Sequence, residues 1–365
     1  MASVEYVEAT HRYPGNRRAA VEQLNLTIES GEFMVLLGAS GSGKTTALRM
    51  LAGLETVDSG AVLIDGEDVS DLEPGERDIA MVFQSYALYP QMTVAENLGF
   101  RLTLAGTPHS AVARRVRRMA SQLDLTPTLD RLPRTLSGGE QQRVAMGRAM
   151  MREPRVYLMD EPLGALDAKL RAEVRSQISN LQRRLGTTML YVTHDQTEAM
   201  TMGDRIAVLR DGNLLQCDAP RVLYENPSNA YVAGFVGSPP MNLLSARVEH
   251  NWALLGDVDV VELPLGYRLV QELAGPEVTV GFRPDRVTLA PPGSGLFAHV
   301  EAVENLGYVS YAHCNAGLGD RRRDVIVRCE PGLAPRVGTA VGIALDPAEV
   351  HFFEPVTGRR LYATR

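Results

Sequence analysis

The amino-acid sequence predicts an α/β domain built on a parallel sheet, followed by a smaller all-β domain. An apolar run at 33–37 leads through a glycine- and serine-rich turn into a helical pattern at 45–54, the order that begins a parallel sheet. Two more apolar runs, at 156–162 and 188–195, end in polar residues, as buried strands that lead to a site do. From about residue 241 onward, short apolar runs alternate with turn residues, which favours a small barrel or sandwich.

The remaining elements follow from periodicity. Residues 1–30 alternate polar and apolar side chains, which predicts short strands. Residues 61–69 predict a hairpin with an Asp-Gly turn at 65–66, and residues 206–216 predict another. A mostly helical region is expected over about 93–150.

The character of the chain changes near the Gly-Ser-Pro-Pro segment at 237–240, so we expect domains at 1–237 and 238–365. The second domain carries short runs typical of antiparallel strands: EVTVGF, FAHVEAV, DVIVRC, AVGIAL and EVHFF.

Composition excludes several classes of protein. The chain has 365 residues, 45% hydrophobic and 22% charged, as expected for a globular protein of two domains. No apolar run approaches the roughly 20 residues that cross a bilayer, and no signal-peptide pattern is visible, which predicts a cytoplasmic location. A net charge of −7 argues against nucleic-acid binding, and three scattered cysteines indicate neither disulfides nor a zinc site.

The segment GASGSGKT at 38–45 matches the phosphate-binding loop of nucleoside triphosphatases. Its glycines let the backbone wrap phosphates, Lys44 can reach the terminal phosphates, and the Thr45 hydroxyl can ligate Mg²⁺. The strand before it and the helix after it are the context that this motif requires. The predicted nucleotide-binding residues here are Gly38, Ala39, Ser40, Gly41, Ser42, Gly43, Lys44, Thr45 and Thr46.

Two carboxylates follow the apolar run at 156–159. Asp160 is placed to hold Mg²⁺, and Glu161 follows at the edge of the sheet where ligands of parallel sheets bind. A carboxylate one residue after the metal-binding aspartate can orient and deprotonate an attacking water. A transferase with a hydroxyl acceptor would not need such a base, so the pair favours hydrolysis.

A second anion-binding feature lies in LSGGEQQRVAMGRAM, at 136–150. Ser137, Gly138 and Gly139 precede a helical pattern, where unpaired N–H groups and the helix dipole favour an anion. One nucleotide does not obviously need two such sites in one chain.

Three further residues remain ambiguous from the sequence alone. His194 ends an apolar run and can donate to a γ-phosphate, Gln84 follows another run and can contact Mg²⁺ or water, and Tyr13 can stack on a nucleobase. Taken alone, a residue of each kind at such a position is more often a packing or polar surface residue than a ligand-binding one.

Taken in order, these motifs resemble the nucleotide-binding subunit of ABC transporters over about residues 3–236. The resemblance extends to the regulatory domain of the ATPase subunit of maltose-type carbohydrate importers. The C-terminal segments that carry it are FVGSPPMN at 235–242, GFRPDRV at 281–287 and VHFFEPVTGRRL at 350–361.

This resemblance implies a P-loop ABC-type ATPase domain with a RecA-like core, an antiparallel β subdomain and a helical subdomain, plus a C-terminal all-β, OB-like regulatory domain. It implies ATP and Mg²⁺ as cofactors. Tyr13 would stack on adenine, Thr45 and Gln84 would ligate Mg²⁺ with Asp160, and Lys44 would bind phosphate. Glu161 would be the general base, and His194 would sense the γ-phosphate.

The resemblance also answers the question of the second anion site, because it implies a head-to-tail homodimer. Ser137, Gly138 and Gly139 would then contact the partner's ATP, and Asp167 would lie at the dimer seam. The Gln84 loop and the helical subdomain would contact two transmembrane permease subunits, which a solute-binding protein outside the cell supplies. The chain would therefore work at the cytoplasmic face of the membrane. Glu140, where glutamine is common, and Gly164-Ala165 depart from the family pattern without removing a required group.

Alternative functions fit less well. Importers of polyamines, sulfate or iron also carry β-rich regulatory domains, so the resemblance leaves the solute open between these and a carbohydrate such as maltose, trehalose or glycerol 3-phosphate. A non-transport ABC ATPase would show a coiled-coil insertion or tandem nucleotide domains, and neither is present. A P-loop kinase would leave the LSGG segment and His194 unexplained.

Overall fold

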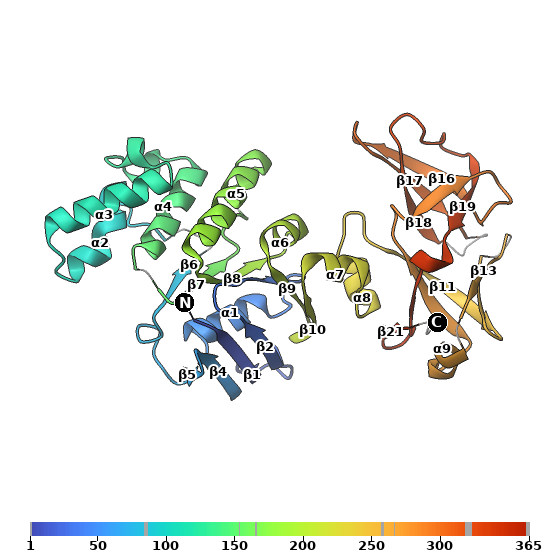
Figure 1. Ribbon diagram of the computed structural model, residues 1–365, viewed down its shortest axis with the longest axis horizontal. Helices are drawn as coiled ribbons and strands as arrows, with labels where there is room; N and C mark the ends of the chain where they lie inside the picture. The colour runs from blue at the N-terminus through green and yellow to red at the C-terminus, as the bar shows by residue number, and fades with distance from the viewer. Residues whose placement is uncertain are drawn as a thin grey trace. The chain divides into compact units, whose positions relative to one another are not determined.

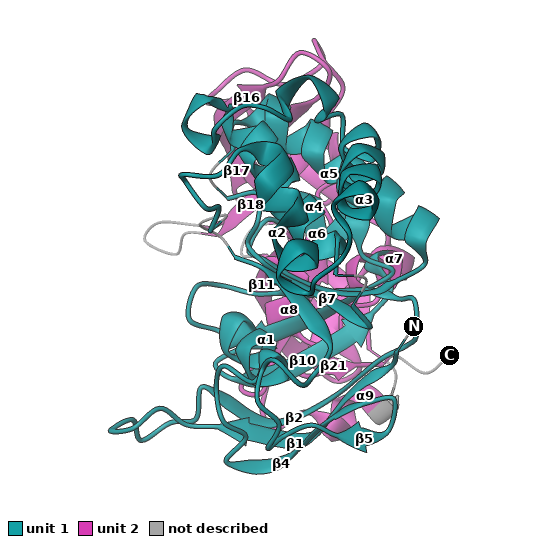
Figure 2. Ribbon diagram, turned by 90° about the vertical axis from the view of Figure 1, so that its left-hand side faces the viewer, with its two compact units in different colours: residues 1–220 teal, residues 221–365 magenta. Residues whose placement is uncertain are grey.

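The computed structural model describes residues 2–83, 87–152, 154–164, 166–256, 259–265, 267–317 and 323–362 (Figure 1). The chain forms two compact units, residues 1–220 and 221–365, drawn in teal and magenta in Figure 2. Within the described residues, no helix combines the length and the apolar character needed to cross a membrane.

The first unit contains the predicted α/β domain. Its elements in chain order are β1 (Val4–His11), β2 (Val21–Ile28), β3 (Phe33–Leu37), α1 (Lys44–Ala52), β4 (Ser59–Ile64), β5 (Glu67–Asp68), β6 (Ile79–Val82), α2 (Val94–Leu104), α3 (His109–Gln122), the 3-10 turns η1 (Thr126–Thr128) and η2 (Pro133–Thr135), α4 (Gly138–Met150), β7 (Val156–Asp160), α5 (Ala168–Leu185), β8 (Thr188–Thr193), α6 (Gln196–Met202), β9 (Arg205–Arg210) and β10 (Asn213–Asp218).

The parallel sheet has the strand order β10-β9-β3-β8-β7-β6. Strands β9, β3, β8, β7 and β6 pair in parallel, and β10 joins β9 as the expected antiparallel hairpin. Every residue of β3, β7 and β8 is buried, which explains why these strands read as continuous apolar runs and not as alternating patterns. The prediction of a parallel sheet is confirmed.

A second, antiparallel sheet with the order β2-β1-β4-β5 accompanies it. Its hairpin turns at Asp65 and Gly66, which have φ angles of 51° and 77°, the left-handed conformations that such a turn requires. Apolar residues of this sheet, of α1 and of the parallel strands share one core. The hydroxyl of Tyr6 donates to the Ala47 carbonyl of α1 (2.9 Å) and so connects this sheet to the helix that follows the phosphate-binding loop.

The expected helical region contains α2, α3 and α4, which gather at one end of the first unit in Figure 1. Helices α2 and α4 each begin with a capping box, formed by Thr93 with Glu96 and by Ser137 with Glu140. This reciprocal pairing satisfies two N–H groups at each helix start, those of Thr93 and Glu96 in α2 and those of Ser137 and Glu140 in α4. The start of α4 at residue 138 is therefore determined by local sequence.

The second unit is mostly antiparallel, as predicted. Its sheets have the orders β13-β12-β11-β14-β20-β21 and β15-β19-β16-β17-β18, and their apolar faces enclose one core. Its elements are α7 (Pro220–Glu225), α8 (Ala230–Phe235), β11 (Asn242–Glu249), β12 (Trp252–Leu255), β13 (Val261–Pro264), α9 (Tyr267–Glu272), β14 (Glu277–Phe282), β15 (Val287–Ala290), β16 (Leu296–Asn305), β17 (Ser310–Asn315), β18 (Asp324–Cys329), β19 (Ala340–Leu345), η3 (Pro347–Glu349), β20 (His351–Phe353) and β21 (Arg360–Leu361).

The division between the two units lies at residue 220, ahead of the boundary at 237 expected from the sequence. The reason is Arg283, which follows β14 and is 3% exposed. Its guanidinium donates to the carbonyls of Tyr224, Ala233 and Val236. These carbonyls lie at the C-terminal ends of α7 and α8, where the helix dipole favours a cation, so both helices join the β-rich unit.

Candidate functional site

Three neighbouring strands of the parallel sheet end at the same edge. In the order β3-β8-β7, Leu37 pairs with Thr193, and Val192 pairs with Asp160. The loop before α1, the histidine after β8 and the carboxylates that end β7 therefore leave the sheet side by side. This edge is where ligands of open α/β sheets bind.

The loop between β3 and α1 has the backbone of a phosphate-binding loop. Gly41 and Gly43 have φ angles of 77° and 103°, which other residues adopt only at an energetic cost, and a side chain at Gly43 would collide with the Ala20 carbonyl. The Lys44 ammonium donates to the carbonyls of Gly38 and Ala39, both at 2.9 Å. Burial lowers the Lys44 pKa, while the charges of Glu161 and Asp160 act in the opposite direction. The ammonium is therefore held inside the loop, beside two carboxylates.

Thr45 and Asp160 come together across the site, as the sequence predicts for residues that share a cation. The Thr45 hydroxyl donates to a carboxylate oxygen of Asp160 at 2.9 Å. Asp160 is 8% exposed, and burial raises its pKa, which the hydrogen bond from Thr45 partly opposes. A buried carboxylate of this kind favours a cation beside it.

Glu161 occupies an unusual backbone conformation, with a φ angle of 42°. Its N–H donates to the Val192 carbonyl (3.0 Å) and its carbonyl accepts from Gly164 (3.2 Å), so both neighbours hold it in place. Non-glycine residues in this region are rare and gather at functional sites. The Glu161 carboxylate lies 3.1 Å from Nδ1 of His194, which unites two of the predicted catalytic residues.

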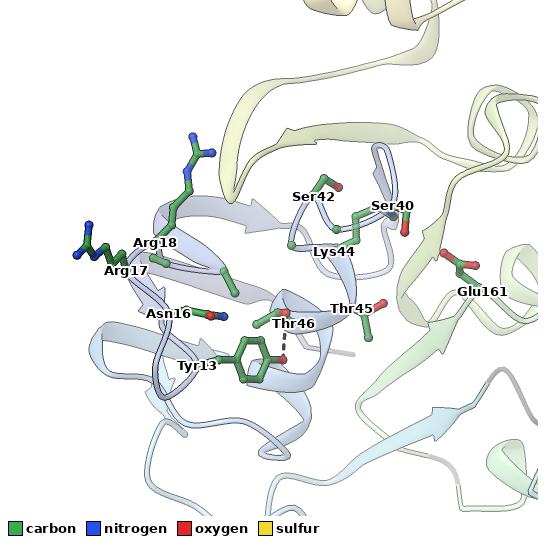
Figure 3. Close-up of a pocket in the computed structure, with 14 residues that line it drawn as sticks. Tyr13, Asn16, Arg17, Arg18, Ser40, Ser42, Lys44, Thr45, Thr46 and Glu161 are labelled. Atoms are coloured by element: carbon green, nitrogen blue, oxygen red, sulfur yellow. Dashed lines mark hydrogen bonds between the residues drawn. The ribbon is translucent and has the colours of Figure 1, made fainter.

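A cavity of about 610 Å³ opens over the phosphate-binding loop (Figure 3). Tyr13 forms part of its wall, with its hydroxyl 3.2 Å from Glu55 and 3.3 Å from Thr46 and its ring edge-on to His11. The other described residues of the wall are Asn16, Arg17, Arg18, Ala19, Ala20, Ser40, Gly41, Ser42, Gly43, Lys44, Thr45, Thr46 and Glu161.

The sequence reasoning missed Asn16, Arg17 and Arg18. They lie in the loop before β2 and reach the cavity beside Tyr13 (Figure 3). The guanidinium groups of the two arginines point away from Lys44 in this view. The two adjacent arginines after the HRYPG segment were the only sequence feature that could have indicated a role. The pairing of β1 with β2 is what brings the loop that carries them to the phosphate-binding loop.

Ser137, Gly138 and Gly139 form the start of α4, outside the wall of this cavity. Ser137 caps the helix by accepting from the Glu140 N–H (3.3 Å), and its hydroxyl and N–H both donate to the Glu140 carboxylate, at 2.9 and 2.7 Å. Gly139 packs so closely on Leu170 of α5 that a side chain at this position would require the Leu170 side chain to move. The LSGG segment is therefore an ordered helix start that its own chain does not bring to the cavity.

Asp167 caps α5 by accepting from the Leu170 N–H at 3.0 Å. Arg171, one turn into α5, donates to the Leu166 carbonyl (2.9 Å) and lies 3.5 Å from the Asp195 carboxylate. Asp195 in turn caps α6, directly after His194. The Arg171 side chain thus connects the Asp167 loop to the loop that carries His194.

The predicted metal ligand Gln84 lies outside the described residues.

Family comparisons agree with this geometry. Residues 21–164 match the ABC transporter family, residues 237–287 match the MalK OB fold domain, and residues 280–353 match the TOBE domain. The match to the first family begins at β2 and includes the phosphate-binding loop, the LSGG segment and the carboxylates of β7.

Curated relatives cover nearly the whole chain. The diacetylchitobiose uptake system ATP-binding protein MsiK of Streptomyces coelicolor is 47% identical over 99% of this chain and 100% of its own length. The sn-glycerol-3-phosphate import ATP-binding protein UgpC of Chromobacterium violaceum is 45% identical over 99% of this chain and 96% of its own length. The trehalose/maltose import ATP-binding protein MalK of Thermococcus litoralis is 46% identical over 94% of this chain and 95% of its own length.

Among solved structures, the dimeric post-hydrolysis state of the ATP-binding cassette MJ0796, bound to ADP and Pi, superimposes with a TM-score of 0.54 at 31% identity. It covers 60% of this chain and 99% of that one. The fold, the residues of the site and the relatives all indicate the same family. The chain belongs to the ABC transporter family as an ATP-binding subunit that hydrolyses ATP.

Proposed function

We propose that this subunit energises an ABC importer for carbohydrates, either an oligosaccharide such as maltose or trehalose or the polyol ester glycerol 3-phosphate. The relatives at 45–47% identity are importer subunits for such solutes, and they match this chain through both units. The MalK OB fold match in the second unit supports the same group.

The observation that carries the enzymatic part is the shared sheet edge, where Lys44, Asp160, Glu161 and His194 meet. ATP binds in the cavity over the loop, with its phosphates on the loop amides and on Lys44. Tyr13, whose hydroxyl lies 3.3 Å from Thr46 in the same wall, stacks on the adenine ring (Figure 3).

The pair Thr45 and Asp160 fits Mg²⁺, because a hydroxyl and a carboxylate lie 2.9 Å apart beside the phosphate-binding loop. Mg²⁺ in such sites takes one or two protein oxygens and completes its shell with substrate phosphates and water. When bound, it neutralises charge on the terminal phosphates. Glu161 accepts a proton from the attacking water, and His194, held by Glu161, donates a hydrogen bond toward the γ-phosphate.

The LSGG segment serves the ATP of a second copy in a head-to-tail homodimer. Its helix start presents Ser137, Gly138 and Gly139 away from the cavity of its own chain, which fits a site completed in trans. The dimeric state of the related cassette supports this arrangement. Asp167 lies at the dimer seam. Arg171 connects the Asp167 loop to the His194 loop, because it donates to the Leu166 carbonyl and to the Asp195 carboxylate.

A groove of about 470 Å³ between α2 and α3 is the docking site that we propose for a permease helix. Its described wall is mostly apolar: Met92, Ala95, Glu96, Gly99, Phe100, Thr103, His109, Val112, Ala113 and Val116. Two permease subunits, one on each protomer, would place the dimer at the cytoplasmic face of the membrane and connect it indirectly to a solute-binding protein. The Gln84 loop is expected to complete the contact.

Two roles are open for the second unit: stabilising the dimer, or docking a regulatory protein or a small effector. Its described β-sheets form a core of their own, which supports either role.

Reconstitution tests the importer proposal. The subunit is combined in proteoliposomes with candidate pairs of permease subunits and their solute-binding proteins, and ATP hydrolysis is measured with each solute. We expect the loaded carbohydrate-binding protein to stimulate hydrolysis. Stimulation by a polyamine, sulfate or iron system instead would refute the carbohydrate assignment and leave the ATPase assignment intact.

A further inference from the structure

Helix α6, which follows His194, carries a carboxylate on its buried side. Glu198 is 3% exposed, and α6 contacts β3 and β8, two of the strands that end at the edge of the site. The other buried residues of this helix, Ala199 and Met202, are apolar. Burying a carboxylate costs free energy that its hydrogen bonds must offset. The partners of Glu198 therefore indicate what the carboxylate does at this position.

The partners of this carboxylate are two hydroxyls of β8. One oxygen of Glu198 accepts from the Thr193 hydroxyl at 2.7 Å and from the Tyr191 hydroxyl at 2.9 Å. Both hydroxyl-bearing residues are buried, so water does not compete for these bonds. Burial raises the Glu198 pKa, and the hydrogen bonds from Thr193 and Tyr191 oppose that rise. The end of β8 is thus tied to the interior side of α6.

These bonds continue around the backbone of His194. The Thr193 hydroxyl gives its one proton to Glu198, so its oxygen accepts from the Asp195 N–H, at 3.0 Å. The Asp195 carboxylate accepts in turn from the Glu198 N–H at 3.2 Å. Thr193, Asp195 and Glu198 therefore close a ring of hydrogen bonds that includes the residues on both sides of His194.

The His194 side chain itself is not held by packing. It is 60% exposed, and its hydrogen-bond partner among the described residues is Glu161, 3.1 Å from Nδ1. An exposed side chain keeps much of its rotamer freedom unless bonds restrict it. The place of the His194 ring therefore depends on that one bond and on the position of the His194 backbone, which the ring of hydrogen bonds holds.

We propose that Glu198 is a positioning residue for ATP hydrolysis, which acts through Thr193 to fix the backbone of His194 so that the ring meets the γ-phosphate in one orientation. The inference rests on the role proposed above for His194. Glu198 does not belong to the described wall of the cavity, so it acts only through its neighbours. A carboxylate suits this task because it only accepts hydrogen bonds, which fixes the direction of the bond from Thr193.

Two substitutions break the ring of hydrogen bonds at different points. Thr193→Val keeps the side-chain volume but removes the acceptor of the Asp195 N–H, and Glu198→Met removes the acceptor of both hydroxyls. Each should lower kcat for ATP hydrolysis by at least about 10-fold, since a misplacement of about 1 Å can cost about 10²-fold. Thr193→Ser keeps the hydroxyl and should restore turnover. Thr201→Val, at an exposed position of the same helix, is the matched control and should hydrolyse ATP like the unsubstituted chain.

Nucleotide affinity separates a positioning role from a purely structural one. A misplaced His194 weakens the contact to the γ-phosphate, so a non-hydrolysable ATP analogue should bind less tightly, whereas the affinity for ADP, which lacks that phosphate, should stay the same. We expect the ratio of the two affinities, measured by calorimetry, to fall about 10-fold in His194→Ala and at least about 3-fold in Thr193→Val and Glu198→Met. A structural defect lowers both affinities together and leaves the ratio unchanged.

The outcomes distinguish this inference from the role assigned to His194. If His194→Ala lowers turnover and the affinity ratio, but the ratio is unchanged in Thr193→Val and Glu198→Met, the positioning role is wrong and the role of His194 stands. If His194→Ala itself leaves turnover and the ratio unchanged, the role of His194 fails and the positioning role fails with it.

Discussion

Nδ1 of His194 lies 3.1 Å from a carboxylate oxygen of Glu161, although the two residues leave different strands of the sheet. The contact exists because β7 and β8 are parallel neighbours whose ends are in register. With Nδ1–H donating to Glu161, the ring is oriented by the same carboxylate that we assign as the base. We therefore propose that the base and the phosphate sensor act as one unit.

Glu161→Gln tests this assignment. The amide oxygen of glutamine can still accept from His194 but cannot take a proton, so we expect hydrolysis to fall about 10²–10⁴-fold. ATP binding should remain, and an ATP-bound dimer should accumulate in size-exclusion chromatography. Glu173→Gln, at an exposed position of α5, serves as the control. Wild-type turnover by Glu161→Gln would show that another group is the base.

Complementation between variants tests the trans site. Lys44→Ala and Ser137→Arg should each be inactive alone. In a head-to-tail dimer, mixing them creates heterodimers with one intact site, so activity should recover to about a quarter of the wild-type rate. If each ATP were enclosed by a single chain, every site would retain a defect and mixing would restore nothing. The measurement is phosphate release as a function of the mixing ratio.

Thr45→Val removes the hydroxyl that faces Asp160 and keeps a similar side-chain volume. We expect the Mg²⁺ concentration needed for half-maximal hydrolysis to rise at least about 10-fold, with magnesium-free ATP binding changed much less. Thr45→Ser, which restores the hydroxyl, should rescue the Mg²⁺ response. An unchanged Mg²⁺ dependence in Thr45→Val would remove Thr45 from the set of ligands.

The capping box at the start of α4 predicts a pH effect on stability. Hydrogen bonds from Ser137, first from its N–H, lower the Glu140 pKa below its ordinary value of 4.5. The stabilisation is thus complete above pH 4.5 and is lost as the pH falls through the lowered pKa. Denaturant unfolding of Glu140→Gln should show a loss of unfolding free energy within about 1 kcal/mol near neutral pH that disappears in acid, because Glu140 is only partly buried and water screens its interactions. A deficit that stays constant to pH 3 would contradict this account.

Arg283→Met should destabilise the second unit by about 2–4 kcal/mol, since it leaves the carbonyls of Tyr224 and Val236 without their side-chain donor and the Ala233 carbonyl with only the Met241 N–H. Arg283→Lys should not rescue the loss, because one ammonium cannot reach carbonyls on two helices. Chemical unfolding followed by the single tryptophan, Trp252 of β12, reports on this unit. Arg247→Met should unfold like the unsubstituted chain.

The parts of the molecule that local sequence encodes were predictable. The phosphate-binding loop, the carboxylates at the end of β7 and the start of α4 each depend on residues a few positions apart, in patterns that only a few backbone conformations satisfy. The buried parallel strands were equally visible, because burial on both faces requires uninterrupted apolar runs.

The tertiary structure alone decided which distant groups meet. The contact of Glu161 with His194, the arrival of Arg17 and Arg18 at the ATP cavity and the capture of α7 and α8 by Arg283 join segments that are far apart in the chain. Periodicity reports which face of an element is buried, whereas strand order and register determine what that face or edge contacts, and these come from packing of the whole unit.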